Sequence, residues 1–232
     1  METVIESSDD ERKKFLMSQL RDLSASDFAS RQLLDRVPWL FSDRSQYIDW
    51  KAALAADLDL DPFMLLVVGS AATGISLSPI KGFSAFGAHS DIDIAVVSLR
   101  HFDEAWRWLR ELGPASLLGK GTFELEMLTW HRRNLVFDGA IATEKLLARL
   151  PFGPKWASGL GHAGNREPTV GREIKVRIYR DFESLRQYHV NNISELKLRL
   201  SSAISDVPPS KLPLLDDNES TTGEVGSRNE SS

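Results

Sequence analysis

Cysteine is absent from this 232-residue chain, and no apolar run is long enough to cross a membrane. The first absence excludes a disulfide scaffold, a thiol nucleophile and a zinc site built from cysteine. The second argues against a membrane span, which needs about 18 or more successive apolar residues. The chain begins with an acidic, polar stretch, METVIESSDDERKK, that lacks the basic and apolar parts of a secretory signal. We therefore expect a soluble, cytoplasmic protein that does not associate with membranes.

Positive charge is also in deficit, since 28 Lys and Arg residues face 33 Asp and Glu residues and the net charge is -5. This balance argues against a general nucleic-acid coat protein, whose surface would be basic. Hydrophobic residues make up 42% of the chain, which is enough for one sizeable core. We expect a flexible leader at residues 1–10, one domain over 11–203, and a disordered acidic and polar tail over 204–232.

The spacing of apolar residues predicts an α/β (α+β) fold. Steps of three and four residues predict helices near residues 10–23, 26–37, 45–57 and 101–112, a short helix at 140–150, and a long C-terminal helix at 181–200. Continuous or alternating apolar residues predict strands at 63–69, 91–97, 122–128 and 173–179. Gly, Pro and Asn predict a loop at 151–171. We expect a short mixed sheet that carries a site on one edge.

One stretch combines a glycine-serine turn with two aspartates. The first predicted strand ends in Gly69-Ser70, where backbone N–H groups and a hydroxyl can point at a phosphate that glycine lets approach closely. The alternative is a simple turn in which Ser70 caps a helix. Asp91 and Asp93 are two residues apart on the next predicted strand, so they project to one face. Their carboxylates repel unless a cation bridges them, and Mg²⁺ prefers such oxygens together with substrate phosphates.

This pattern resembles the signature of the nucleotidyltransferase superfamily, which includes polymerase β-like enzymes: an apolar strand, Gly-Gly or Gly-Ser, an interval, and Asp-apolar-Asp. Ser90 matches the residue often found before the first aspartate. The resemblance implies that Gly69, Ser70 and Ser90 bind the nucleotide, and that Asp91 and Asp93 are catalytic residues that hold Mg²⁺ or Mn²⁺. It implies an enzyme that transfers a nucleoside monophosphate from a nucleoside triphosphate such as ATP to a hydroxyl acceptor, which is a small molecule, a protein or an RNA.

The sequence departs from the family pattern in two places. The interval before Asp91 is longer than usual, and we expect an elaborated loop over the phosphates to which Lys81 adds charge. Active members of the family also place a third carboxylate on a later core strand. The candidate strand here has Arg177 in its middle. The alternative acids are Glu124, Glu126 and Glu173.

A second interpretation places the chain in a different functional class. In it, the chain is a catalytically silent nucleotidyltransferase-like module that binds nucleotide or a partner protein, as a regulator or as one half of a toxin–antitoxin or defence pair. The missing third acid favours this interpretation, whereas the intact Asp91 and Asp93 disfavour it. A carboxylate within metal reach of both aspartates would favour the enzyme, and Arg177 in that space would favour the silent module.

Other residues have both a functional and a structural interpretation. His89 lies beside the aspartates, although the five histidines show no metal-ligand spacing. Trp156 could stack on a base, but packing in the core is the favoured interpretation. Guanidinium groups suit phosphates, although surface charge is the simpler role for arginines on a strand and a helix. The arginines concerned are Arg172, Arg177, Arg180 and Arg186.

Overall fold

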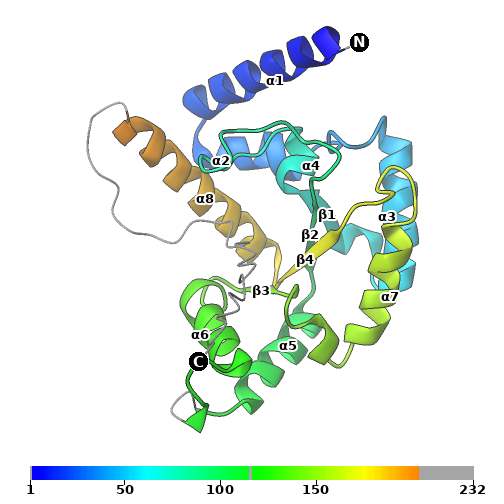
Figure 1. Ribbon diagram of the computed structural model, residues 1–232, viewed down its shortest axis with the longest axis vertical. Helices are drawn as coiled ribbons and strands as arrows, with labels where there is room; N and C mark the ends of the chain where they lie inside the picture. Colours follow the sequence, from blue (N-terminus) through cyan, green and yellow to red (C-terminus); the bar gives the residue numbers. More distant parts are fainter. Residues whose placement is uncertain (1, 115–116, 204–232) are drawn as a thin grey trace, which may run out of the picture.

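The computed structural model describes residues 2–114 and 117–203, and it consists of a four-stranded mixed sheet surrounded by helices (Figure 1). The helices are α1 (Glu2–Asp22), α2 (Ala25–Phe28), α3 (Arg44–Leu58), α4 (Gly69–Thr73), α5 (Leu99–Glu111), α6 (Phe123–Asn134), α7 (Gly153–Ala163) and α8 (Phe182–Ala203). A π-helical turn, η1 (Ala29–Leu34), continues α2, and η2 (Pro62–Met64) and η4 (Leu147–Arg149) are 3₁₀ turns. The predicted α/β class with a long C-terminal helix is confirmed. Within the described residues, no helix has the length and apolar character that a membrane span requires.

The sheet has the strand order β1-β2-β4-β3. Its strands are β1 (Leu65–Val68), β2 (Ile92–Val97), β3 (Ala140–Ala142) and β4 (Ile174–Tyr179). β2 pairs antiparallel with β1 and parallel with β4, and β3 pairs antiparallel with β4. The chain ends of β1 and β3 therefore lie at the same edge of the sheet as the beginnings of β2 and β4.

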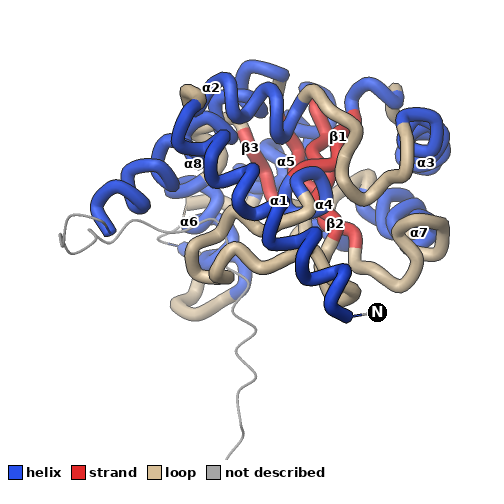
Figure 2. The backbone as a smooth tube through the Cα atoms, turned by 90° about the horizontal axis from the view of Figure 1, so that it is seen from above, coloured by secondary structure: helices blue, strands red, loops and turns tan. Residues whose placement is uncertain are grey.

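Helices cover both faces of the sheet. Figure 2 shows α3 and α7 on one side of the strands and α8 on the other, in agreement with Figure 1. The first face is wholly apolar: Ile92, Ile94 and Val96 of β2 join one buried cluster with residues of α3, α5 and α7. On the second face Ala95 and Val97 pack with Leu185 of α8 in a smaller cluster. Because both faces are covered, β2 is an almost continuous apolar run, interrupted by Asp93.

Three predicted elements are wrong. Residues 122–128 were expected to form a strand, but they begin α6, because Thr122 caps a helix by accepting a hydrogen bond from Leu125 N. Residues 140–150 were expected to form a helix; their first three residues instead form β3 by pairing with β4. The predicted loop at 151–171 contains α7, whose Pro154 stands in the first turn, where a missing N–H costs nothing.

The other predicted helices and strands are present and, apart from the start of α1, lie within a few residues of their expected ends. Helix α1 starts at Glu2, so residues of the predicted leader lie in its first turns. The predicted tail, 204–232, lies outside the described residues.

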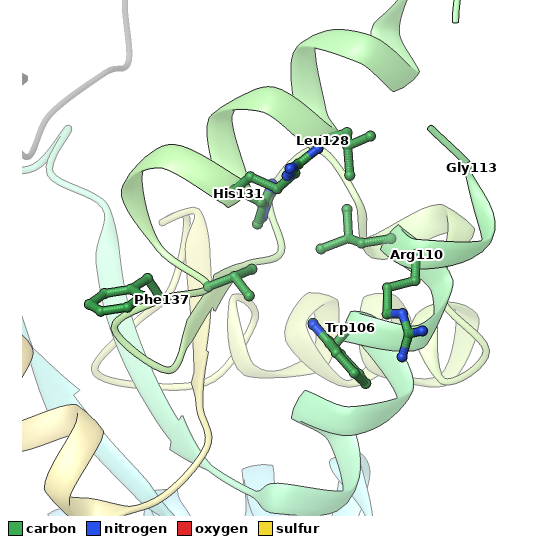
Figure 3. A pocket seen from close by; sticks show the side chains of 9 residues that line it. Trp106, Arg110, Gly113, Leu128, His131 and Phe137 are labelled. Carbon is green, nitrogen blue, oxygen red and sulfur yellow. The ribbon is translucent and has the colours of Figure 1, made fainter. Parts of the chain in front are cut away.

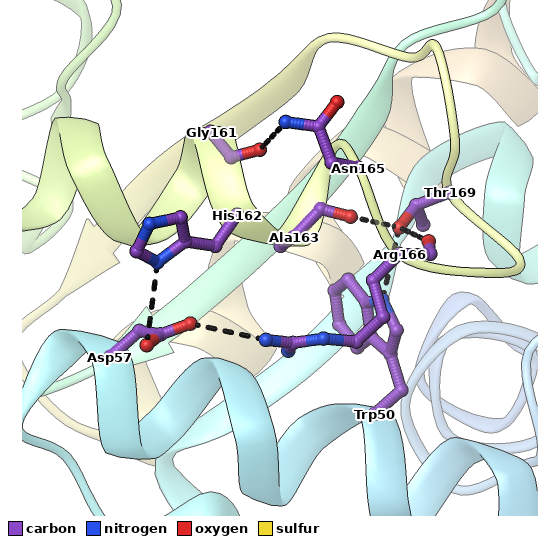
Figure 4. A network of polar contacts seen from close by, with 8 residues as sticks. All are labelled: Trp50, Asp57, Gly161, His162, Ala163, Asn165, Arg166 and Thr169. Atoms are coloured by element: carbon purple, nitrogen blue, oxygen red, sulfur yellow. Dashed lines mark hydrogen bonds and ion pairs between the residues drawn. The ribbon is translucent and has the colours of Figure 1, made fainter.

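A polar network fastens the loop before β4 to α3 (Figure 4). Arg166 Nη2 donates to the Asp57 carboxylate at 3.4 Å, and His162 Nδ1 lies 3.6 Å from the other oxygen of that carboxylate. Trp50 Nε1 donates to the Thr169 hydroxyl at 3.0 Å in a buried hydrogen bond. This loop leads directly into β4, so the network helps to fix where that strand begins.

Candidate functional site

The glycine-serine turn and the two aspartates meet at one edge of the sheet. Val68, the last residue of β1, pairs with Asp93, and Gly69 follows it directly. Gly69 has a φ of +63°, and a β-carbon added to it would lie 2.5 Å from Oδ2 of Asp93. Any other residue would be strained by this φ, and its β-carbon would force the Asp93 carboxylate to shift. Both features favour a glycine where β1 turns past Asp93.

Ser70 lies in the first turn of α4 and is half-buried. The N-cap residue of this helix is Val68, and within the described chain no side chain caps it. The interpretation of Ser70 as a helix cap is therefore wrong. The backbone carbonyl of Ser70 accepts from Gly74 N at 2.7 Å, which closes the turn after the strand.

Asp91 and Asp93 project from the same face of β2, since Ile92 and Ile94 between and beside them are buried on the other face. Asp91 forms an ion pair with Lys175: its Oδ2 lies 2.5 Å from the lysine Nζ. Lys175 is the first outward residue of β4 and is the register partner of Asp93. Both aspartates therefore lie beside one ammonium group, which the sequence analysis did not identify as part of the site.

The position next to the aspartates on β4 is occupied by Lys175 and not by Arg177. The register pairs Arg177 with Ala95, two residues further along both strands. Of the alternative acids, Glu124 is on α6 and bonds to Arg149 Nη1 at 2.5 Å. Glu173 is exposed, and its carboxylate lies 3.9 Å from Lys175 Nζ.

Arg177 is enclosed on the same face by α8 and by the end of β3. Its Nη1 donates to the Tyr188 hydroxyl, and the guanidinium lies 5.1 Å above the Tyr188 ring. Its Nε is buried and has no hydrogen-bond partner in the described part of the chain. Burial alone would lower the pKa of Arg177, but neighbours that include Tyr188, Glu144 and Asp93 raise it. The guanidinium is therefore permanently charged, and Glu144 is a further carboxylate near this edge.

The loop before β2 is held by an arginine of the segment before β4. Arg172 Nη1 donates to the carbonyl oxygens of Ser90, at 3.1 Å, and Gly87. The Ser90 hydroxyl accepts from Gly87 N at 3.0 Å, so Ser90 closes a turn directly before Asp91. His89 is exposed in this turn. Arg172 thus positions the loop that carries Ser90 and Asp91.

The longer interval forms a bridged loop that folds back on α1. Ile75 pairs with Ala85, and Lys13 of α1 donates to the carbonyl of Gly82 at 3.2 Å. Lys81 lies exposed at the apex of this loop. The predicted contribution of Lys81 to phosphate binding stays a prediction.

Two other candidates have structural roles. Trp156 is completely buried and donates to the Leu58 carbonyl at 3.1 Å, so it belongs to the core. Arg186 donates to Ser26 and Ser30, which ties α8 to α2 and η1. Arg180 is exposed.

Asp91 and Asp93 are the residues of this edge that could hold a divalent cation. Asp91 and Asp93 supply hard carboxylate oxygens of the kind that Mg²⁺ and Mn²⁺ prefer. Across residues 2–114 and 117–203, however, no group of three or more His, Asp or Glu side chains is arranged to hold a metal ion. The ammonium of Lys175 offsets the negative charge of Asp91 without a metal ion. A single cation that arrives with the phosphates of a nucleotide would have enough ligands, because the phosphates supply the rest.

A cavity of about 430 Å³ lies away from this edge, between α5 and α6 (Figure 3). Its lining is mostly apolar and includes Trp106, Leu128 and Phe137, with Arg110 at its rim. The predicted nucleotide residues belong to β1, α4 and β2. The cavity is therefore a separate feature of the surface.

No family model, no curated protein and no solved structure matches the chain. The resemblance to nucleotidyltransferases accordingly depends on the motif residues and on their arrangement.

Proposed function

We propose that the chain binds a nucleoside triphosphate at the edge formed by Gly69, Ser70, Asp91 and Asp93, and transfers the nucleoside monophosphate to a hydroxyl acceptor. The observation that carries this proposal is the contact between Gly69 and Asp93, where an added β-carbon would lie 2.5 Å from the carboxylate. It brings the two halves of the motif, which a long loop separates in the sequence, to one point. A solvent-exposed pair of aspartates with no ligand would not need a glycine in a left-handed conformation beside it.

The roles of the residues follow from their positions. Gly69 and Ser70 offer backbone N–H groups and a hydroxyl to the β- and γ-phosphates. A divalent cation held by the aspartates would offset the phosphate charge and stabilise the departing pyrophosphate. In the transfer, the acceptor oxygen forms a bond to the α-phosphorus as the bond from the α-phosphorus to the bridging oxygen breaks. Pyrophosphate leaves with that electron pair, and the acceptor proton passes to solvent.

A second candidate function is nucleotide binding without transfer, as in a silent regulatory or defence-associated module. The observation that favours it is that β4, the later core strand on which the resemblance implies a third carboxylate, places Lys175 beside Asp93. With Lys175 paired to Asp91, the edge carries less negative charge than a site for two cations needs. The two candidates share the binding site and differ in the chemistry.

Incubation with each α-³²P-labelled nucleoside triphosphate and Mg²⁺ or Mn²⁺ tests the proposal. We expect label to move to protein, to added RNA or to a new small product. Asp93→Asn should abolish the transfer, because it removes one negative charge with little change of shape. The matched control is Asp103→Asn on α5, whose carboxylate forms a surface ion pair with Arg107, and it should leave the transfer unchanged.

Two outcomes would contradict the proposal. Nucleotide that binds to the wild type and not to Asp93→Asn, with no label transferred to any acceptor, would favour the silent module. A wild-type chain that binds none of the four nucleotides would contradict both candidate functions.

A further inference from the structure

Lys175 is more enclosed than Lys155, which also forms an ion pair. Its side chain is 11% exposed and its Nζ lies 2.5 Å from Asp91 Oδ2. For comparison, the Lys155 side chain is 56% exposed and its Nζ lies 3.8 Å from Asp59. Lysine is rarely buried unless it is paired, since its ammonium loses hydration. The enclosure of Lys175 therefore indicates a specific role for its charge.

Three carboxylates surround this one ammonium. Asp91 contacts it directly, Glu173 lies 3.9 Å away, and Asp93 is its neighbour in the register. Burial by itself would lower the pKa of Lys175, but the hydrogen bond that Lys175 donates to Asp91 and the charges of Asp91, Glu173 and Asp93 raise it. Lys175 therefore keeps its positive charge to a higher pH than an ordinary lysine does.

The surroundings of Lys175 are those of a cation site. Carboxylates that converge on one point repel each other, and either a metal ion or an ammonium relieves the repulsion. The ammonium has three donors and a compact charge, so it can contact carboxylate and phosphate oxygens at once. A metal ion at the same point would have to displace it from Asp91.

We propose that Lys175 is a built-in cation that takes the place of one of the two metals of a two-metal site, so that this edge holds at most one divalent cation. The description of the edge as a nucleotide site rests on the proposed function, whereas the displacement of a metal by Lys175 does not. Two roles follow: Lys175 holds Asp91 in position before the nucleotide arrives, and it adds positive charge beside the phosphates.

Titration with Mn²⁺ alone, followed by electron paramagnetic resonance of the free ion, tests this proposal without a nucleotide. The variants are Lys175→Met, which keeps the apolar stem, and Lys175→Glu, which adds a carboxylate. We expect the wild type to bind no more than one Mn²⁺ per chain. Lys175→Met should bind Mn²⁺ at least tenfold more tightly than the wild type, and Lys175→Glu more tightly still. The control, Lys155→Glu, makes the same change of charge on α7 and should leave the affinity unchanged.

Two tight Mn²⁺ ions on the wild-type chain would overturn the proposal whatever the variants do. Equal Mn²⁺ affinity in the wild type, Lys175→Met and Lys175→Glu would overturn it too. Adding Asp91→Asn to Lys175→Met should reverse the gain, since Asp91 is the ligand that the substitution releases. Circular dichroism identifies any variant that does not fold. In that case the number of Mn²⁺ ions bound per wild-type chain decides the proposal. Binding of the nucleotides is measured separately, so the proposed function can fail while the Mn²⁺ result stands.

Discussion

The two faces of the sheet are built from the same strands, but one face is apolar and the other carries charged side chains. On the face covered by α3, α5 and α7, Ile92, Ile94 and Val96 belong to one buried apolar cluster, and their burial stabilises the fold. On the opposite face the same strand carries Asp93, and β4 carries Lys175 and Arg177, the second of which contacts Tyr188 of α8. Charged groups in this half-buried position do not stabilise a fold by themselves. The difference indicates that packing specifies the first face, whereas the second face carries the charged groups of the proposed site.

The largest expected effect lies on the apolar face. Ile94 is 1% exposed and lies between strands β1 and β4. Ile94→Ala should lower the free energy of unfolding by about 2–5 kcal/mol, from lost burial and the cavity left behind. Asp93→Asn, one residue earlier, should change it by less than the Ile94 substitution. Urea denaturation measures both, and a larger loss in Asp93→Asn would contradict the division between the two faces.

The second effect concerns pH and the helix that covers the polar face. His189 of α8 is buried, and burial, together with the charge of Arg177, lowers its pKa to about 4. Below about pH 6.5 His189 binds a proton in the unfolded chain but stays neutral in the folded chain until the pH approaches 4. Stability is therefore complete above that pH and falls by up to about 3 kcal/mol as the pH drops from 6.5 to 4.

The histidine can be tested by the slope of stability against pH. Burial and, to a lesser extent, Arg100 also lower the pKa of His101 to about 4, and burial lowers the pKa of His131, so all three histidines contribute to this slope. His189→Gln should remove its own part of the slope in urea denaturation between pH 4 and 7. His89→Gln changes an exposed histidine and serves as the control substitution. An unchanged slope in His189→Gln would show that His189 is not buried as a neutral side chain.

A smaller expected change in stability distinguishes the backbone strain at Gly69 from its close approach to Asp93. Gly69 and Gly82 have φ angles of +63° and +61°, but a β-carbon would meet Asp93 only at Gly69 and nothing within 4 Å at Gly82. Gly82→Ala should cost about 1–2 kcal/mol from the left-handed conformation alone. Gly69→Ala should cost more, and it alone should weaken the binding of nucleotide, as measured by calorimetry. Equal costs would mean that the Gly69–Asp93 contact is not tight.

The smallest expected change in stability comes from an exposed ion pair that lies on neither face of the sheet. Arg107 Nη2 lies 2.7 Å from Asp103 Oδ2 on the exposed side of α5. An exposed pair at this spacing is worth about 0.3–0.5 kcal/mol. Asp103→Asn should therefore change the free energy of unfolding by no more than this. A loss above 1 kcal/mol would show that surface charge matters here more than we infer.

The sequence predicted most of the elements that border the site, because their signals are local. The apolar run that ends at Gly69 and the alternation around Asp91 and Asp93 each specify a strand without reference to the rest of the chain. In the wrong elements the local signal is absent or misleading. In α6 the residues Phe123, Leu125 and Met127 alternate as in a strand, and the buried set of Met127, Leu128 and His131 becomes visible only in the folded chain.

The role of Lys175 could not be predicted, since it depends on the register between two strands that are far apart in the sequence. Counting along β4 alone makes Arg177 the central residue, and only the pairing of Asp93 with Lys175 shows which side chain faces the aspartates. If β4 were shifted by one residue, the side chains of Lys175 and Arg177 would turn to the opposite face of the sheet. Pairing of this kind is decided by packing of the whole sheet. β3 is a similar case, because three residues rich in alanine become a strand only through β4.

The parallel pairing of β2 with β4 also decides whether the motif can be separated from the rest of the chain. Residues 65–97 contain Gly69, Ser70, Asp91 and Asp93 without interruption, and so have the form of a portable module. In the folded protein, however, the strand beside the aspartates comes from the far end of the domain. A segment transplanted into another protein would keep every motif residue and leave one side of β2 unpaired. The motif is thus contiguous in the sequence, but its charge balance belongs to the whole domain.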